Sequence, residues 1–74
     1  MAFRVIADIE YLEGNLKGLP LVRGWACNYP NMRLAQKTAC WLERVRQDDD
    51  FIRAAVTGDR YKVTGHIVIE RVAI

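Results

Sequence analysis

The strongest constraint on the fold is a change in hydrophobic period along the chain. Over residues 3–12, apolar side chains alternate with polar ones, which is typical of a half-buried antiparallel strand. Residues 13–18 contain two glycines and an asparagine and are expected to form a hairpin loop. A second strand is predicted over residues 19–27, where Pro20 suits an edge position and Gly24 suits a bulge.

After this strand the period becomes helical. Apolar or small residues recur at a spacing of about 3.6 and fall within one broad arc of a helix. The members of this arc are Leu34, Ala35, Thr38, Ala39, Trp41, Leu42 and Val45. We expect the arc to lie on the sheet, with Trp41 in its middle. Asn28 or Asn31 is expected to cap the helix, with Pro30 in its first turn.

The C-terminal third is less regular. Asp48–Asp50 either end this helix or begin another, because carboxylates suit a helix N-terminus. We favour a short helix over residues 51–57, and the alternative is a strand that turns at Gly58 and Asp59. Residues 61–74 are rich in Val and Ile and apolar on both faces, which predicts a central or covered strand. The sequence therefore predicts one α+β domain over residues 1–74, with an antiparallel sheet, one amphipathic helix packed on one face, and the order β-β-α-(α)-β.

Length and composition suggest a surplus of apolar surface. The chain has 74 residues, of which 51% are apolar. A domain of this size buries only about 60% of the surface that its unfolded chain exposes. We therefore expect a protein partner or a second copy, giving a possible homodimer, to cover part of the surface.

The cysteines and the N-terminus favour a cytoplasmic location. Two cysteines do not make a disulfide framework, so both thiols are expected to be reduced, Cys40 exposed on the helix and Cys27 buried. The first residues lack the basic and apolar regions of a signal peptide, and no stretch approaches the roughly 18 apolar residues of a membrane helix. We expect no association with a membrane.

The residue types argue against catalysis, a metal site or a cofactor. The chain has no serine and one histidine, His66, so nothing suggests an oriented nucleophile and base. A structural zinc site needs four ligands and typically a close pair of cysteines, which is absent. The glycines are scattered and form no phosphate-binding loop. We predict a protein that is not an enzyme and needs no cofactor.

Two groups of residues are candidates for binding a partner. Arg33, Lys37 and Arg44 form a narrow basic stripe on the outer face of the predicted helix, which suits phosphates or an acidic protein. Such a stripe is also common on a solvated helix. The second group is Arg23, Trp25 and Tyr29, residue types that dominate interface energetics. The net charge of +2 is low for a dedicated nucleic-acid-binding protein.

The organisation of the chain resembles that of a class of small viral proteins. The segment FRVIADIE is followed by a Gly-containing hairpin, a strand that carries Trp25, one amphipathic helix and a closing β segment. In size and order this resembles the small proteins encoded by phages and prophages, including anti-CRISPR inhibitors of bacterial defence. The resemblance implies a non-enzymatic protein that occludes a partner's surface. A small nucleic-acid-binding protein and an oligomeric assembly subunit are the alternative functions.

Overall fold

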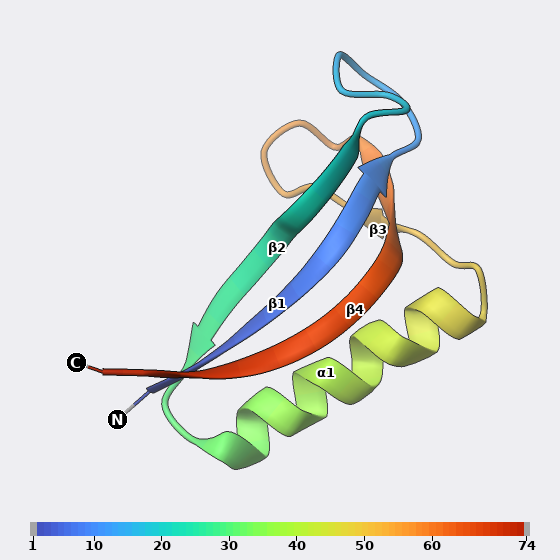
Figure 1. Cartoon of the computed structure of the whole chain (residues 1–74). Coiled ribbons are helices and arrows are strands. Elements are labelled where there is room, and N and C mark those ends of the chain that lie inside the picture. The colour runs from blue at the N-terminus through green and yellow to red at the C-terminus, as the bar shows by residue number, and fades with distance from the viewer. Residues whose placement is uncertain (1, 74) are drawn as a thin grey trace.

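The computed structural model, which describes residues 2–73, contains one antiparallel sheet and one helix. The elements are β1 (Ala2–Tyr11), β2 (Pro20–Tyr29), α1 (Met32–Gln47), β3 (Ile52–Arg53) and β4 (Arg60–Val72). The sheet has the order β2-β1-β4-β3. Figure 1 shows that the strands curve together and that α1 covers one face of the sheet. The predicted α+β class, with one helix on one face of an antiparallel sheet, is confirmed.

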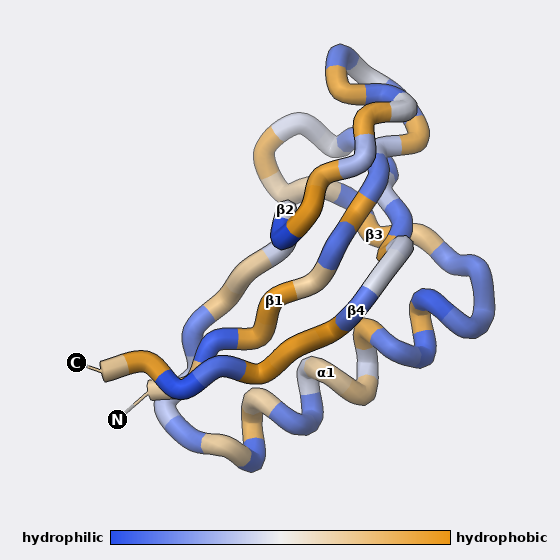
Figure 2. The backbone as a smooth tube through the Cα atoms, viewed as in Figure 1, coloured by the Kyte–Doolittle hydropathy of each residue, from blue (hydrophilic) through white to orange (hydrophobic). Residues whose placement is uncertain are grey.

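The core lies between α1 and the two central strands. Val5 and Ala7 of β1 are completely buried, and they lie in one hydrophobic cluster with Ala35 and Leu42 of α1, which are also completely buried. Val63 of β4 belongs to the same cluster. The hydropathy view shows apolar residues along β1 and β4 where they lie side by side (Figure 2). The alternation of apolar and polar residues that predicted β1 therefore arises because one side of the strand is buried against α1.

On the face of the sheet without a helix, an arginine side chain crosses the central strand β1 to form an ion pair. Ile6 points away from Val5 and Ala7, yet it is only 3% exposed. Arg23 of β2 reaches across β1 to Glu70 of β4, where its guanidinium lies 2.8 Å from the carboxylate. The arginine stem spans the strand that carries Ile6, as long cationic side chains commonly do over apolar surface.

Both strands beside β1 bulge at the same place. Asp8 has Val22–Gly24 opposite it on β2 and Thr64–His66 opposite it on β4. Arg23 adopts a left-handed conformation there, with φ of 57°, and its backbone N–H donates to the Asp8 carboxylate at 2.8 Å. The bulge predicted at Gly24 is confirmed, and β4 has a matching bulge at Gly65. Bulges of this kind bend and twist a sheet.

Local polar groups set both ends of α1. The Asn31 side chain accepts a hydrogen bond from the Leu34 N–H at 3.0 Å, which confirms one of the two predicted caps. At the other end Asp49 has φ of 53°, and the N–H of Asp50 donates to the Val45 carbonyl at 3.0 Å. This arrangement terminates a helix and satisfies its last carbonyl groups.

The short helix predicted over residues 51–57 is wrong. Ile52–Arg53 form β3, which pairs with Arg60 and Tyr61 of β4. The chain then turns back through residues 55–57. Asp48–Asp50 close α1 and so cannot open another helix, and Ile52 packs against the core. The alternative prediction, a strand followed by a turn near Gly58, is closer to the structure.

Two predictions of burial are also wrong. Trp41 is 45% exposed, because the buried side of α1 is centred on Ala35 and Leu42 and leaves Trp41 at its margin. Cys27 is exposed because β2 is an edge strand. Cys40 is exposed as predicted. In the described part of the chain, α1 is neither long enough nor apolar enough to cross a membrane.

Candidate partner-binding site

Aromatic side chains gather where the β2 edge adjoins α1. The rings of Trp25 and Trp41 stand edge to face, with centroids 6.5 Å apart and planes at 63°. Tyr29 is half-buried at the end of β2 and packs against the core cluster. The β2–α1 surface is defined here by Trp25, Tyr29, Leu34, Lys37, Trp41 and Arg44. It combines a sheet edge with one side of a helix.

The helical residues of this surface are neighbours by spacing. Leu34, Lys37 and Trp41 lie at positions i, i+3 and i+7, so they follow one side of α1. Leu34 is 41% exposed and lies two helical turns before Trp41, so the apolar part of this surface extends along α1 from Trp41 to Leu34. A shallow hollow beside them is lined by Lys37, Cys40, Trp41 and Arg44. The exposed indole is therefore flanked by two cations.

The charge of this surface has one sign. No Asp or Glu occurs between Glu13 and Glu43, so β2 and the first eleven residues of α1 lack carboxylates. Lys37 and Arg44 are exposed, and within residues 2–73 neither takes part in an ion pair. Glu43 accepts hydrogen bonds from the guanidinium of Arg46, on the side of α1 that adjoins β4. No carboxylate of residues 2–73 therefore forms an ion pair with the two cations on the β2 side.

The phenol of Tyr29 is held at the inner edge of this surface. Partial burial raises the pKa of Tyr29 above its ordinary value of 10.0, and a hydrogen bond with the Thr38 side chain partly offsets this rise. Tyr29 therefore remains neutral at physiological pH and can present an amphipathic ring to a ligand. It contributes no charge that would oppose the nearby cations.

The structure separates the two groups of candidates predicted from the sequence and recombines them. Arg23 lies on the opposite face, where Glu70 holds its guanidinium, so it does not join Trp25 and Tyr29. Lys37 and Arg44 instead line a hollow with Trp41, whose ring contacts that of Trp25. Arg33 is exposed one turn before Lys37 on α1 and extends the basic stripe.

Sequence reasoning missed Leu34 and Trp41 as surface residues. Both belong to the helical arc, and a period cannot show where the margin of the buried side falls. The absence of carboxylates between Glu13 and Glu43 is the sequence signal that could have marked the surface. Such a long run with cations and no acid is unusual in a chain whose net charge is only +2.

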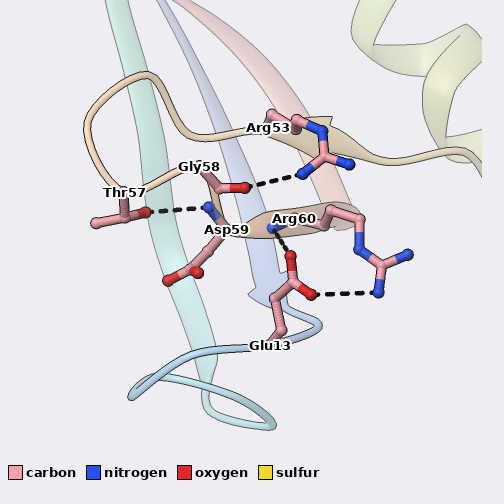
Figure 3. A network of polar contacts seen from close by, with 6 residues as sticks. All are labelled: Glu13, Arg53, Thr57, Gly58, Asp59 and Arg60. Carbon is pink, nitrogen blue, oxygen red and sulfur yellow. Dashed lines mark hydrogen bonds and ion pairs between the residues drawn. The ribbon is translucent and has the colours of Figure 1, made fainter.

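A second concave region lies at the other end of the sheet, where the loop after β1 meets the loop after β3. It is lined by Tyr11, Asn15, Leu16, Thr57 and Asp59. Figure 3 shows polar contacts within the β3–β4 connection and between it and the loop after β1. Glu13 accepts from the backbone N–H of Arg60 at 3.1 Å and from its guanidinium at 3.3 Å, which lowers the pKa of Glu13. Arg53 donates to the Gly58 carbonyl at 3.1 Å.

These loop contacts are satisfied among themselves. Thr57 accepts from the Asp59 N–H at 3.2 Å, and the guanidinium of Arg60 also lies 5.3 Å from the centre of the Phe51 ring. The network therefore ties the two loops together, and the guanidinium groups of Arg53 and Arg60 both donate hydrogen bonds within it. The β2–α1 surface, whose cations are unpaired within the described residues, is the stronger candidate for binding.

Among residues 2–73, no three His, Cys, Asp or Glu side chains lie close enough together to hold a metal ion. The chemistry available at the β2–α1 surface is therefore that of recognition: stacking on the exposed indole of Trp41, hydrogen bonding to a strand edge and attraction of anions. Comparison of the chain with models of known protein families, with curated proteins and with solved structures finds no match.

Proposed function

We propose that this protein is a non-catalytic protein-binding module that acts by covering a working surface of its partner. The observation that carries this proposal is the β2–α1 surface. There, half-buried Trp25 contacts exposed Trp41, which is flanked by Lys37 and Arg44, two cations without an ion pair among residues 2–73. Interfaces are enriched in such aromatic and cationic residues, and a few buried aromatic anchors carry most of the binding energy.

The physical form of the molecule supports steric action. The domain measures 36 × 25 × 19 Å, and the surface spans a strand and a helix that are packed on a common core. A rigid surface loses little conformational entropy on binding. The resemblance in size and organisation to phage-encoded inhibitors favours the same mode of action. The two exposed thiols fit a reducing, intracellular compartment.

The proposal is tested with two matched double variants in a pull-down. Lys37→Glu/Trp41→Ala alters the β2–α1 surface, whereas Lys17→Glu/Leu16→Ala makes a similar change in the loop after β1. Leu16 is 44% exposed and Trp41 is 45% exposed, so both truncations remove exposed apolar side chains.

We expect the wild-type protein and the loop variant to capture the same partner, and the surface variant to lose it. The wild-type protein should also inhibit the purified partner at a one-to-one ratio. Equal capture by both variants, or capture that disappears after nuclease treatment, would contradict a protein-binding function for this surface.

A second candidate function, the binding of single-stranded nucleic acid, is favoured by one observation. Trp41 is exposed between Lys37 and Arg44, and an aromatic ring flanked by cations can stack a base and attract phosphate. Binding of this kind should quench Trp fluorescence when single-stranded DNA is added, and the affinity should fall steeply with salt. Unchanged fluorescence at low salt would exclude this candidate.

A further inference from the structure

The unpaired edge of β2 offers a more specific mode of binding at the proposed surface. The strand order places β2 and β3 at the two edges of the sheet. β3 has only two residues, whereas β2 has ten. At an edge strand, backbone N–H and C=O groups that point outward have no partner and can pair with an added strand.

Only the second half of β2 lacks the features that protect natural edges. Such edges are commonly blocked by Pro, charges or bulges. Pro20 begins the strand, and the bulge with charged Arg23 and Gly24 occupies its middle. The remaining segment, Trp25-Ala26-Cys27-Asn28-Tyr29, has no charge, proline or bulge and pairs regularly with β1. Its three central residues are exposed.

We infer that an acidic, extended segment of the protein partner adds to the sheet as a fifth strand along residues 25–29. This inference rests on the proposed protein-binding function and specifies its mode. Main-chain pairing with the edge would give affinity. Lys37 and Arg44, which flank Trp41 where it meets Trp25, would select carboxylates. The side chains of the added strand that lie on the α1 side would meet Trp25 and Trp41.

Charge favours this occupant over a second copy of the chain. A two-fold pairing of β2 with itself would place both helices on the same face of a continuous sheet. Each copy would bring Arg33, Lys37 and Arg44 to that face, and no carboxylate lies on β2 or on α1 before Glu43. A carboxylate-bearing strand would neutralise these cations, whereas a second copy would add to them. A nucleic acid would lack the regular backbone donors and acceptors that pair with a strand edge.

The test begins with a displayed library of short random peptides selected on the whole wild-type protein. The selected peptides are then measured against Lys37→Glu, and Lys17→Glu serves as the control with the same change in net charge. We expect peptides in which Asp or Glu recurs at alternate positions, bound by wild type and Lys17→Glu but at least tenfold more weakly by Lys37→Glu. No enrichment, or enrichment of basic or neutral peptides, would overturn the inference.

The site of binding is then measured by amide hydrogen exchange on the complex with the selected peptide. Added protection confined to residues 25–29 is expected, because new main-chain hydrogen bonds form there. Protection elsewhere in the complex would overturn strand addition by an acidic partner. So would a free protein that forms a dimer in which the amides of residues 25–29 are already protected. Strand addition can fail in this way while the pull-down still shows a partner that depends on Trp41 and Lys37, which would leave the proposed function standing.

Discussion

Asp8 organises the middle of the sheet because both neighbouring strands bulge around its side chain. One carboxylate oxygen accepts the N–H of Arg23, a residue held in a left-handed conformation that is uncommon outside glycine. On the β4 side the carboxylate packs against Gly65, where an added Cβ would lie 3.0 Å from the Asp8 Cβ and 3.1 Å from its Cγ. Glycine is therefore required at 65 for a close approach.

Replacement of this glycine should be costly unless Asp8 is also removed. Gly65→Ala should lower the free energy of unfolding by about 1–3 kcal/mol, the usual range for overpacking. In an Asp8→Ala background the same change should cost at least about 0.5 kcal/mol less, because residues in contact do not behave additively. Urea denaturation of the four proteins measures this coupling, and strictly additive effects would show that the carboxylate is not what excludes a side chain.

At the scale of elements, α1 depends on a single side-chain cap. Asn31 is extended and accepts the Leu34 N–H, and the first turn contains no acidic residue that could assist it. Asn31→Ala should therefore destabilise the protein by about 1 kcal/mol, whereas Asn31→Asp should preserve or increase stability through the cap and the helix dipole. Thermal denaturation of both variants provides the measurement. Equal losses from Ala and Asp would mean that the hydrogen bond is not the stabilising feature.

The orientation of α1 can be tested with two identical substitutions on it. Leu42 is completely buried, and Leu34 is 41% exposed. Leu42→Ala should cost about 2–5 kcal/mol, as expected for a buried leucine that leaves a cavity. Leu34→Ala should cost well under half as much, because part of its side chain already contacts water. Chemical denaturation of the two variants compares them directly, and similar losses would show that the helix is rotated from the position described.

The strands and the helix could be predicted from sequence because their periods report burial, but local signals failed where tertiary pairing decides. From sequence, Asp48–Asp50 are compatible with either the end or the start of a helix. The left-handed conformation of Asp49 and the pairing of Ile52 with Tyr61 show that these residues end α1. A short isolated helix is also costly to nucleate, so a strand pairing that buries Ile52 prevails.

The proposed binding surface could be predicted from the sequence only in part, for a related reason. Residue type predicts Trp25 and Tyr29, and helical spacing predicts Lys37 and Arg44. The structure places all four on the side of the sheet that α1 covers. Residue type also predicts Arg23 as a member of this surface, but the bulge directs its side chain across β1 to Glu70. Whether a strand residue falls on one face or the other depends on such bulges, which a regular period of two does not reveal.

At the scale of the whole molecule, stability is coupled to pH through a tyrosine in the core. Tyr61 is 7% exposed, and its ring centre lies 5.4 Å from that of Tyr11. Burial raises the pKa of Tyr61 above its ordinary value of 10.0, and a hydrogen bond with the Trp25 indole partly offsets the rise. Burial therefore favours the neutral phenol in the folded state.

The sign of this coupling predicts a loss of stability in alkali. Below pH 10 both folded and unfolded chains carry the neutral phenol, so its contribution is fully present. As the pH rises further, the phenol ionises first in the unfolded chain. Its contribution to the free energy of unfolding then falls progressively, and the loss is complete once the pH has passed the raised pKa of the folded state. Tyr61→Phe should therefore flatten the alkaline decline in the free energy of unfolding. Lysines also titrate there, but they are common to both proteins, so the difference between their pH profiles isolates the phenol. Parallel profiles from urea denaturation would show that Tyr61 is not protonated preferentially in the folded core.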